Sequence, residues 1–153
     1  MTKITPRDIL IAPGVGTYVM TFMSHTDAVV PGHIVTQVDG SQKTCCWPDA
    51  AGDVSLGIVG CSPGHDIDAA YTAGDTFPVY MVGGGATVWV RYRTNGGALV
   101  AGSPVMADGG TGDGLAIVGA DSATIFNAGI GRSIAWHDNI ASESWVAVKL
   151  CGV

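Results

Sequence analysis

Three cysteines and one histidine in the first half of the chain have the residue types of a zinc site. Cys45, Cys46, Cys61 and His65 follow the spacing C-C-x14-C-x3-H. Structural zinc usually takes ligands in pairs about two to four residues apart, so that each pair can turn towards one ion. Adjacent cysteines in an extended chain point to opposite sides and chelate poorly. We therefore expect no metal, no disulfides, and cysteines that behave as small buried hydrophobic residues.

A thiol or hydroxyl beside a histidine would be a second kind of chemistry. The candidate bases are His25, His33, His65 and His137. The chain has no G-x-S-x-G elbow, no H-E-x-x-H motif and no paired carboxylates at a spacing known from acid–base catalysis. A small Cys/His hydrolase remains an alternative. The patterns favour a protein that is not an enzyme, with no catalytic residue and no cofactor.

Residues 107–114 (ADGGTGDG) place two aspartates among glycines, like part of a calcium-binding repeat. Asp113 falls one position early for the G-G-x-G-x-D pattern, and a single copy cannot stack into a calcium roll. The stretch is more typical of a hairpin loop.

One strand candidate combines tryptophan and arginine on a single face. In residues 86–93 a period of two separates alternate apolar residues from Trp89, Arg91 and Arg93. Tryptophan and arginine contribute a large share of the binding energy at protein interfaces. We therefore predict that these three residues contact a partner protein or another subunit. A solvated outer strand face is the alternative.

The elements that hold these residues are predicted to be short β-strands. The chain has 153 residues, enough for about one domain, with 23 glycines, 7 prolines, 47% hydrophobic residues and 13% charged residues. The usual charged share is about a quarter. This composition argues against a helical bundle, a coiled coil or a long disordered tail. Glycine-punctuated β structure remains.

The net charge limits the kinds of partner that the chain can bind. The net charge is -6, the pI is near 4.8, and the seven basic residues are scattered along the chain. Direct nucleic-acid binding needs clustered Lys and Arg, so we expect none. No apolar run approaches the roughly 18 residues of a membrane span, and Pro6, Asp8 and Pro13 interrupt any signal-peptide core. We expect a protein made in the cytoplasm whose charge-poor surface is covered in an assembly. A surface of Ser, Thr, Gly and Ala is the alternative.

The fold class predicted is all-β, a small barrel or sandwich of short antiparallel strands with an extended N-terminal arm. Alternation in residues 144–150 indicates a half-buried strand, and residues 66–73 could form a short helix. Ala-Gly dipeptides precede several strand candidates, which is a weak internal repeat or chance. The remaining strand candidates are 17–22, 33–38, 54–59, 77–82, 86–93, 104–107, 115–118 and 130–136.

Residues 1–28 differ from the body, residues 29–153, and are predicted to form the arm. Pro6, Pro13, Gly14 and Gly16 divide short apolar pieces that lack a helical period. Something must cover those apolar pieces, either a neighbouring subunit or the body of the domain. The residues predicted to make that contact are Ile4, Ile9, Leu10 and Ile11.

Six short motifs follow one another in a distinctive order. They are VVPGHIVTQVDG (29–40), LGIVG (56–60), AGDTFPVY (73–80), ALVAGSPV (98–105), AGIGRSIA (128–135) and VAVKL (146–150). This order resembles the small capsid decoration, or cement, proteins of tailed bacteriophages and related viruses. Two departures are Ser103, where an acidic residue is frequent, and the Cys45-Cys46-Trp47 segment, which has no counterpart.

The resemblance implies a compact β-barrel on the outer surface of an icosahedral head. It implies a homotrimer that clamps neighbouring major capsid subunits and stabilises the expanded lattice, because a ligand stabilises the state that it binds. Virion location and the major capsid protein as partner are thus expectations. The alternative is a β-barrel receptor or glycan-binding module of the head-fibre or adhesin type. Its aromatic platform would come from Trp47, Trp89, Trp136 or Trp145.

Overall fold

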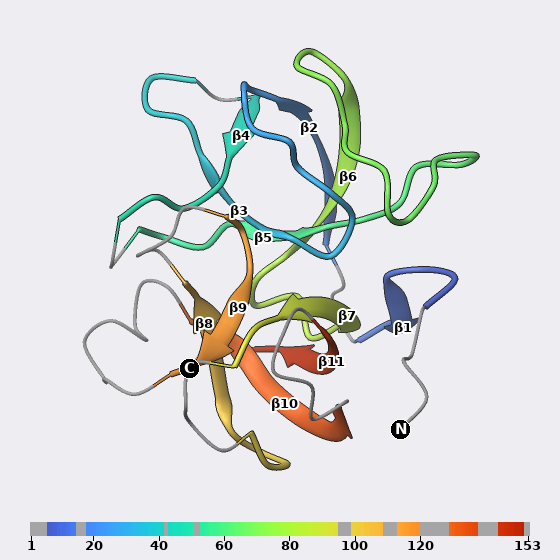
Figure 1. The fold of residues 1–153 in the computed structure, drawn as a ribbon, viewed down its shortest axis with the longest axis vertical. Coiled ribbons are helices and arrows are strands. Elements are labelled where there is room, and N and C mark those ends of the chain that lie inside the picture. The colour runs from blue at the N-terminus through green and yellow to red at the C-terminus, as the bar shows by residue number, and fades with distance from the viewer. Residues whose placement is uncertain are drawn as a thin grey trace.

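The computed structural model describes residues 6–14, 18–41, 43–50, 53–94, 99–108, 113–119, 129–137 and 144–151, with the backbone alone for 135–137. This part of the chain is all-β, as predicted (Figure 1). Residues 66–69 form a turn instead of a helix. The strands are β1 (Leu10–Ala12), β2 (Val19–Ser24), β3 (Ile34–Gln37), β4 (Thr44–Cys46), β5 (Gly57–Val59), β6 (Thr76–Met81), β7 (Thr87–Tyr92), β8 (Pro104–Ala107), β9 (Ala116–Val118), β10 (Gly129–His137) and β11 (Ser144–Leu150).

Strands β2 to β6 close into a barrel, which we call barrel 1. The strand order around it is β2-β4-β3-β5-β6. The first strand, β2, is antiparallel to β6 and parallel to β4, and the other neighbours are antiparallel. Short antiparallel pairs separated by turns are what the glycine-rich sequence favours.

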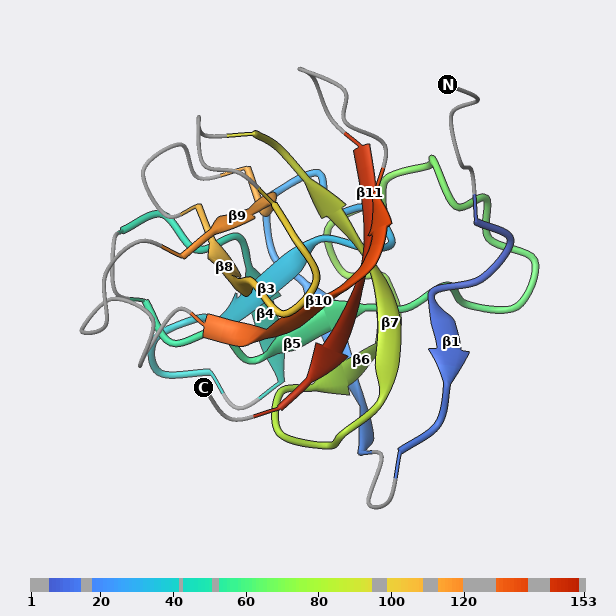
Figure 2. The same cartoon turned by 90° about the horizontal axis from the view of Figure 1, so that it is seen from below.

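Strands β7 to β11 form a second ring, barrel 2. Their order is β7-β11-β10-β8-β9, and a parallel pairing of β7 with β9 closes it. Strand β1 adds to the outer edge of β7 (Figure 2). In Figure 1 barrel 1 lies above barrel 2, and the β6–β7 connection joins them.

The two barrels have the same topology. In each, the first strand is antiparallel to the fifth and parallel to the third, and the second strand pairs with the third and fourth. The residue pairs also correspond: Ser24 opposite Cys45 in barrel 1 matches Tyr92 opposite Ala116 in barrel 2. The chain therefore contains an internal structural repeat with a spacing of about 70 residues, which differs from the 27 to 28 residues that separate three of the Ala-Gly dipeptides in the sequence.

A shared turn marks the same point of both repeats, just before the second strand. In barrel 1, His33 N donates to Val30 O (3.1 Å) and Val30 N donates to His33 Nδ1 (3.2 Å). In barrel 2, Ser103 N donates to Val100 O (3.0 Å) and Val100 N donates to Ser103 Oγ (3.0 Å). Gly32 and Gly102 both have positive φ, which these tight turns require.

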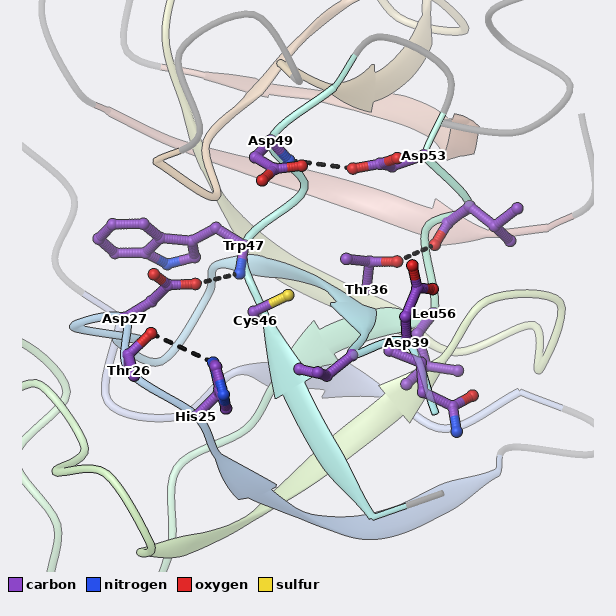
Figure 3. A pocket seen from close by; sticks show the side chains of 13 residues that line it. His25, Thr26, Asp27, Thr36, Asp39, Cys46, Trp47, Asp49, Asp53 and Leu56 are labelled. Carbon is purple, nitrogen blue, oxygen red and sulfur yellow. Dashed lines mark hydrogen bonds between the residues drawn. The ribbon is translucent and has the colours of Figure 1, made fainter. Parts of the chain in front are cut away.

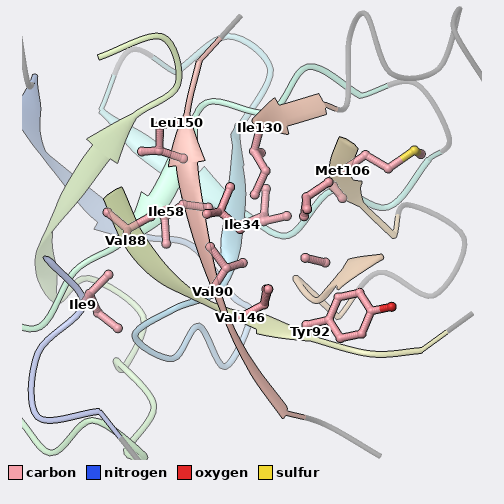
Figure 4. Packing of buried hydrophobic residues seen from close by; sticks show 14 of the residues in the cluster. Ile9, Ile34, Ile58, Val88, Val90, Tyr92, Met106, Ile130, Val146 and Leu150 are labelled. Carbon is pink, nitrogen blue, oxygen red and sulfur yellow. The ribbon is translucent and has the colours of Figure 1, made fainter. Parts of the chain in front are cut away.

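Strands β3 and β5 form a wall between two hydrophobic cores. Val35 and Val59 point into barrel 1, whose core also contains Phe22, Tyr71, Phe77 and Cys45. Their neighbours Ile34 and Ile58 point the other way and join the core of barrel 2 (Figure 4). Since side chains alternate along a strand, two apolar neighbours in sequence are buried on opposite faces.

Strand β11 differs from its prediction as a half-buried strand. Trp145 and Ala147, expected on an outer face, are 3% exposed, and only Lys149 of this strand is exposed. The reason is position: β11 lies between β7 and β10, and Trp145 on its second face contacts the turn of barrel 1 at Gly32.

The N-terminal segment pairs with the body of the chain in the part of it that the structure describes. Strand β1 pairs with β7, and β2 is a full member of barrel 1. Ile9 is completely buried in the core of barrel 2, and Phe22 is buried in barrel 1. Ile9 and Phe22 are thus covered by the body of the chain, and burying them stabilises the pairing.

Candidate functional site

The predicted recognition residue Arg91 lies at the contact between the barrels. Its Nε donates to Pro31 O (2.9 Å), and its Nη2 donates to Ile67 O (2.8 Å) and to Asp68 Oδ1 (2.7 Å). The guanidinium lies 4.3 Å from the ring centroid of Trp145. The Arg91 side chain is 11% exposed, and because it is bonded to three groups of barrel 1 it joins the two barrels within one chain.

The same contact continues at Trp47 and His33. Trp47 Nε1 donates to His33 Nδ1 (3.0 Å), and Gly114 of barrel 2 lies against both side chains. Ile34 N donates to Gly114 O (2.8 Å), so a backbone bond crosses the junction. A side chain at position 114 would collide with Trp47, which explains why glycine fits there.

Burial lowers the pKa of His33 from 6.5 to about 3, and the nearby positive charge of Arg91 acts in the same direction. Its Nδ1 accepts two hydrogen bonds, from Val30 N and Trp47 Nε1. Both observations place a neutral imidazole at the junction, acting as a structural acceptor.

The other predicted contact residues lie in different environments. Trp89 is half-buried against the core of barrel 2, and Arg93 forms ion pairs with Asp108 and Asp113 (2.8 Å to the latter). Ile9 is buried, Leu10 is partly buried and Ile11 is 42% exposed. Ile4 lies outside the described residues. The role of these residues at a capsid or subunit interface stays a prediction. For Ile9 and Arg91, the contacts that the structure describes lie within the chain.

A cavity of about 770 Å³ opens on barrel 1 (Figure 3). Two of its carboxylates bind backbone: Asp27 accepts from Trp47 N (2.7 Å), and Asp53 accepts from Asp49 N (3.0 Å) and Ala50 N (3.1 Å). Thr36 Oγ1 donates to Val54 O (2.8 Å) on the opposite wall. The lining is acidic, and it comprises residues 25–27, 36–39, 46, 47, 49, 53, 54 and 56.

Three of the thiols, those of Cys45, Cys46 and Cys61, are poor nucleophiles. Burial raises the pKa of Cys45 to about 12, with a smaller contribution from Cys46. Burial also raises the pKa of Cys46, helped by the carboxylates of the cavity, and that of Cys61. A thiol that stays protonated at neutral pH does not attack a substrate readily.

The residues with zinc-like spacing have separate roles. Cys45 is in the core of barrel 1, and Cys46 lines the cavity. Cys61 Sγ donates to His65 O (3.1 Å), while the His65 ring stacks on Tyr71 at 3.9 Å. In the described ranges, no group of three or more His, Cys, Asp and Glu is placed to hold a metal ion. Asp108 and Asp113 of the calcium-like loop bind Arg93 instead.

Exposed apolar side chains gather on β2, a surface that the sequence did not single out. Tyr18 is 67% exposed, Met20 52%, Val19 49% and Met23 39%. The signal that could have found it is the run YVM at residues 18–20, which lacks the polar alternation of a strand with one solvated face. No helix in the part of the chain that the structure describes is long and apolar enough to cross a membrane.

Comparison with known proteins adds one structural likeness. The sequence matches no protein-family model and no curated protein. The fold is similar to that of the head fiber gp8.5 N base in bacteriophage phi29, with a TM-score of 0.51. The match covers 90% of this chain and 98% of that chain at 12% sequence identity. At this identity the likeness is one of fold, and it extends over both barrels.

Proposed function

We propose that the chain is a structural protein of a phage virion. It sits as a homotrimer on the outer surface of the icosahedral head, clamps neighbouring major capsid subunits and stabilises the expanded lattice. The observation that carries this proposal is the fold shared with a phage head-fibre base along nearly the whole chain. The ordered motifs from residue 29 to residue 150 point to the same class of protein.

The chemistry of the described residues agrees with a binding role. The thiols described above are held protonated, and the buried imidazole of His33 accepts structural hydrogen bonds. The apolar surface of β2 offers area for contact with another protein. Binding that selects the expanded lattice stabilises it by mass action.

A second candidate is the base of a head fibre or a receptor-binding module, which the likeness to a head-fibre base favours equally. Its glycan-binding form depends on an accessible aromatic platform. Trp145 is buried, Trp47 and Trp89 are half-buried, and the side chain of Trp136 lies outside the described residues. Trp47 at the acidic cavity is therefore the best placed of the described tryptophans.

Binding to heads tests the first candidate. The purified protein is mixed with expanded and unexpanded heads of the phage whose genome encodes it, both lacking this chain. We expect saturable binding to expanded heads and a higher melting temperature for them, with weaker binding to unexpanded heads. Absence of binding to either lattice would contradict the proposal. A glycan array tests the second candidate, with a signal that Trp47→Ala abolishes.

A further inference from the structure

We propose that copies of this chain bind one another head to tail, repeating between molecules the contact that joins barrel 1 to barrel 2 within one molecule. The turn at residues 100–103 of one copy binds the outer side of β2 in the next copy. This inference concerns the isolated protein, so it stands or falls independently of head binding.

The contact within the chain supplies the template. The turn at residues 30–33, which precedes the second strand of barrel 1, packs against β7, the first strand of barrel 2. Arg91 of β7 donates from its backbone N to Gly32 O (3.0 Å) and from its side chain to Pro31 O (2.9 Å). Pro31, Gly32 and His33 are buried there.

Because the barrels are repeats, each half of this contact has a counterpart. The turn at residues 100–103 has the same two hydrogen bonds and the same positive-φ glycine as the turn at residues 30–33. Met23 is the fifth of six residues in β2, as Arg91 is the fifth of six in β7. Both counterparts keep exposed apolar side chains, with Val100 60% and Met23 39% exposed, although Gly102 O, the counterpart of Gly32 O, already accepts from Arg132 Nη1 (3.0 Å).

Exposed apolar residues concentrate on these two counterparts. Five of the eight large apolar side chains that are exposed in the described residues belong to them: Tyr18, Val19, Met20, Met23 and Val100. The corresponding edge of β7 is protected by β1, whereas no described strand pairs with β2 on that side at Val19–Thr21. Apolar surface of this kind favours association.

The contact between copies differs in chemistry from the contact within the chain. Met23 replaces the arginine, and Met23 N already donates to Lys43 O (2.7 Å). The partner turn presents Val100 and Ala101, so both sides are apolar. A second copy is the occupant that the structure supports, because one chain carries both complementary surfaces and shows internally how such surfaces fit. A head-to-tail contact closes into a ring or extends as a chain.

Substitutions on the two surfaces test the proposal. Val100→Asp alters the turn, and Met23→Asp alters the strand, with Thr21→Arg as a second strand variant at an exposed position. Sedimentation equilibrium of the native chain should show an oligomer, and each variant should raise its dissociation constant roughly tenfold or more. Val54→Asp is the matched control, since Val54 is 64% exposed on neither surface. Thermal unfolding of every variant confirms that it folds.

Mixing the variants distinguishes a head-to-tail contact from a symmetric one. Val100→Asp retains an intact β2 surface, and Met23→Asp retains an intact turn. Each variant alone should be monomeric, while the mixture should form one-to-one pairs and nothing larger. A monomeric native chain at high micromolar concentration would overturn the proposal. So would an oligomer that folded Val100→Asp and Met23→Asp variants leave unchanged, or a mixture that stays monomeric.

Discussion

The two barrels share a topology but fill their interiors differently. Barrel 1 encloses its own core of aromatic and small side chains, including Phe22, Tyr71 and Phe77. Barrel 2 recruits residues from outside its ring, with Ile9 from the N-terminal segment and Ile34 and Ile58 from the wall of barrel 1. The contrast indicates that barrel 2 depends on its neighbours within the chain, whereas barrel 1 leaves apolar side chains of its own first strand exposed.

The largest loss of stability is expected at two glycines that lie against the backbone of a neighbouring strand, one in each barrel. Gly131 of β10 and Gly57 of β5 are both in the fourth strand of their barrel, and a Cβ on either would collide with a carbonyl oxygen of the fifth strand. Gly131→Ala and Gly57→Ala should each lower the free energy of unfolding by about 4 kcal/mol, measured by urea titration.

Gly102→Ala is the control for these two variants. Gly102 has a φ of 85° but no atom within 4 Å of an added Cβ, so its cost comes from conformation alone. We expect about 1 kcal/mol. Equal costs at all three glycines would show that the close approach to the fifth strand has no energetic weight.

Removing the Arg91 side chain should weaken the contact between barrel 1 and barrel 2. Arg91→Ala leaves Pro31 O and Ile67 O without these donors and removes the cation–π contact with Trp145. We expect a loss of about 3 kcal/mol in unfolding free energy. Arg132→Ala is the control, because Arg132 is exposed and should cost less than about 1 kcal/mol. Equal losses in the two variants would contradict the junction described here.

Acid should destabilise the junction through His33. Its pKa is about 3 in the folded chain and 6.5 in the reference state, so below pH 6.5 the unfolded chain binds a proton that the folded chain does not. Stability present above pH 6.5 is therefore lost as the pH falls towards 3, by about 2 kcal/mol between pH 6.5 and pH 5. His33→Gln should flatten this part of the pH profile of unfolding, and an unchanged slope would contradict the assignment.

The smallest effect concerns the repeated turn. Ser103→Ala removes the acceptor of Val100 N, and Asp75→Ala removes the acceptor of Thr72 N in a turn of the same kind. Each should cost about 1 kcal/mol, since both turns lie near the surface. Differential scanning calorimetry would detect a fall of a few degrees in melting temperature. If only one variant is affected, the turns are not energetically equivalent.

Strand positions could be predicted from the sequence wherever apolar alternation was bounded by glycine. The strands at residues 104–107 and 144–150 match their predicted bounds, and the other predicted strands overlap the observed ones. Strands β1 and β4, of three residues each, were not predicted. The repeat of about 70 residues was not predicted either, since a shared strand order does not require shared residues.

The roles of Arg91 and His33 could not be predicted from local pattern. The alternation in residues 86–93 predicted Arg91 on an outer face, because a strand with alternating apolar residues is expected to have one buried side. In the structure, barrel 1 covers that other side, so the arginine binds carbonyls of a segment about 60 residues earlier in the chain. Contacts of such sequence separation follow from the packing of the two barrels on each other.

Cryo-electron microscopy of a phage particle that carries this chain tests the proposed function most directly. We expect two-barrel density on the outer surface of the head, in contact with major capsid subunits, with β2 of each copy covered by the turn at residues 100–103 of the next. Particles that carry the chain nowhere on the head surface would contradict it.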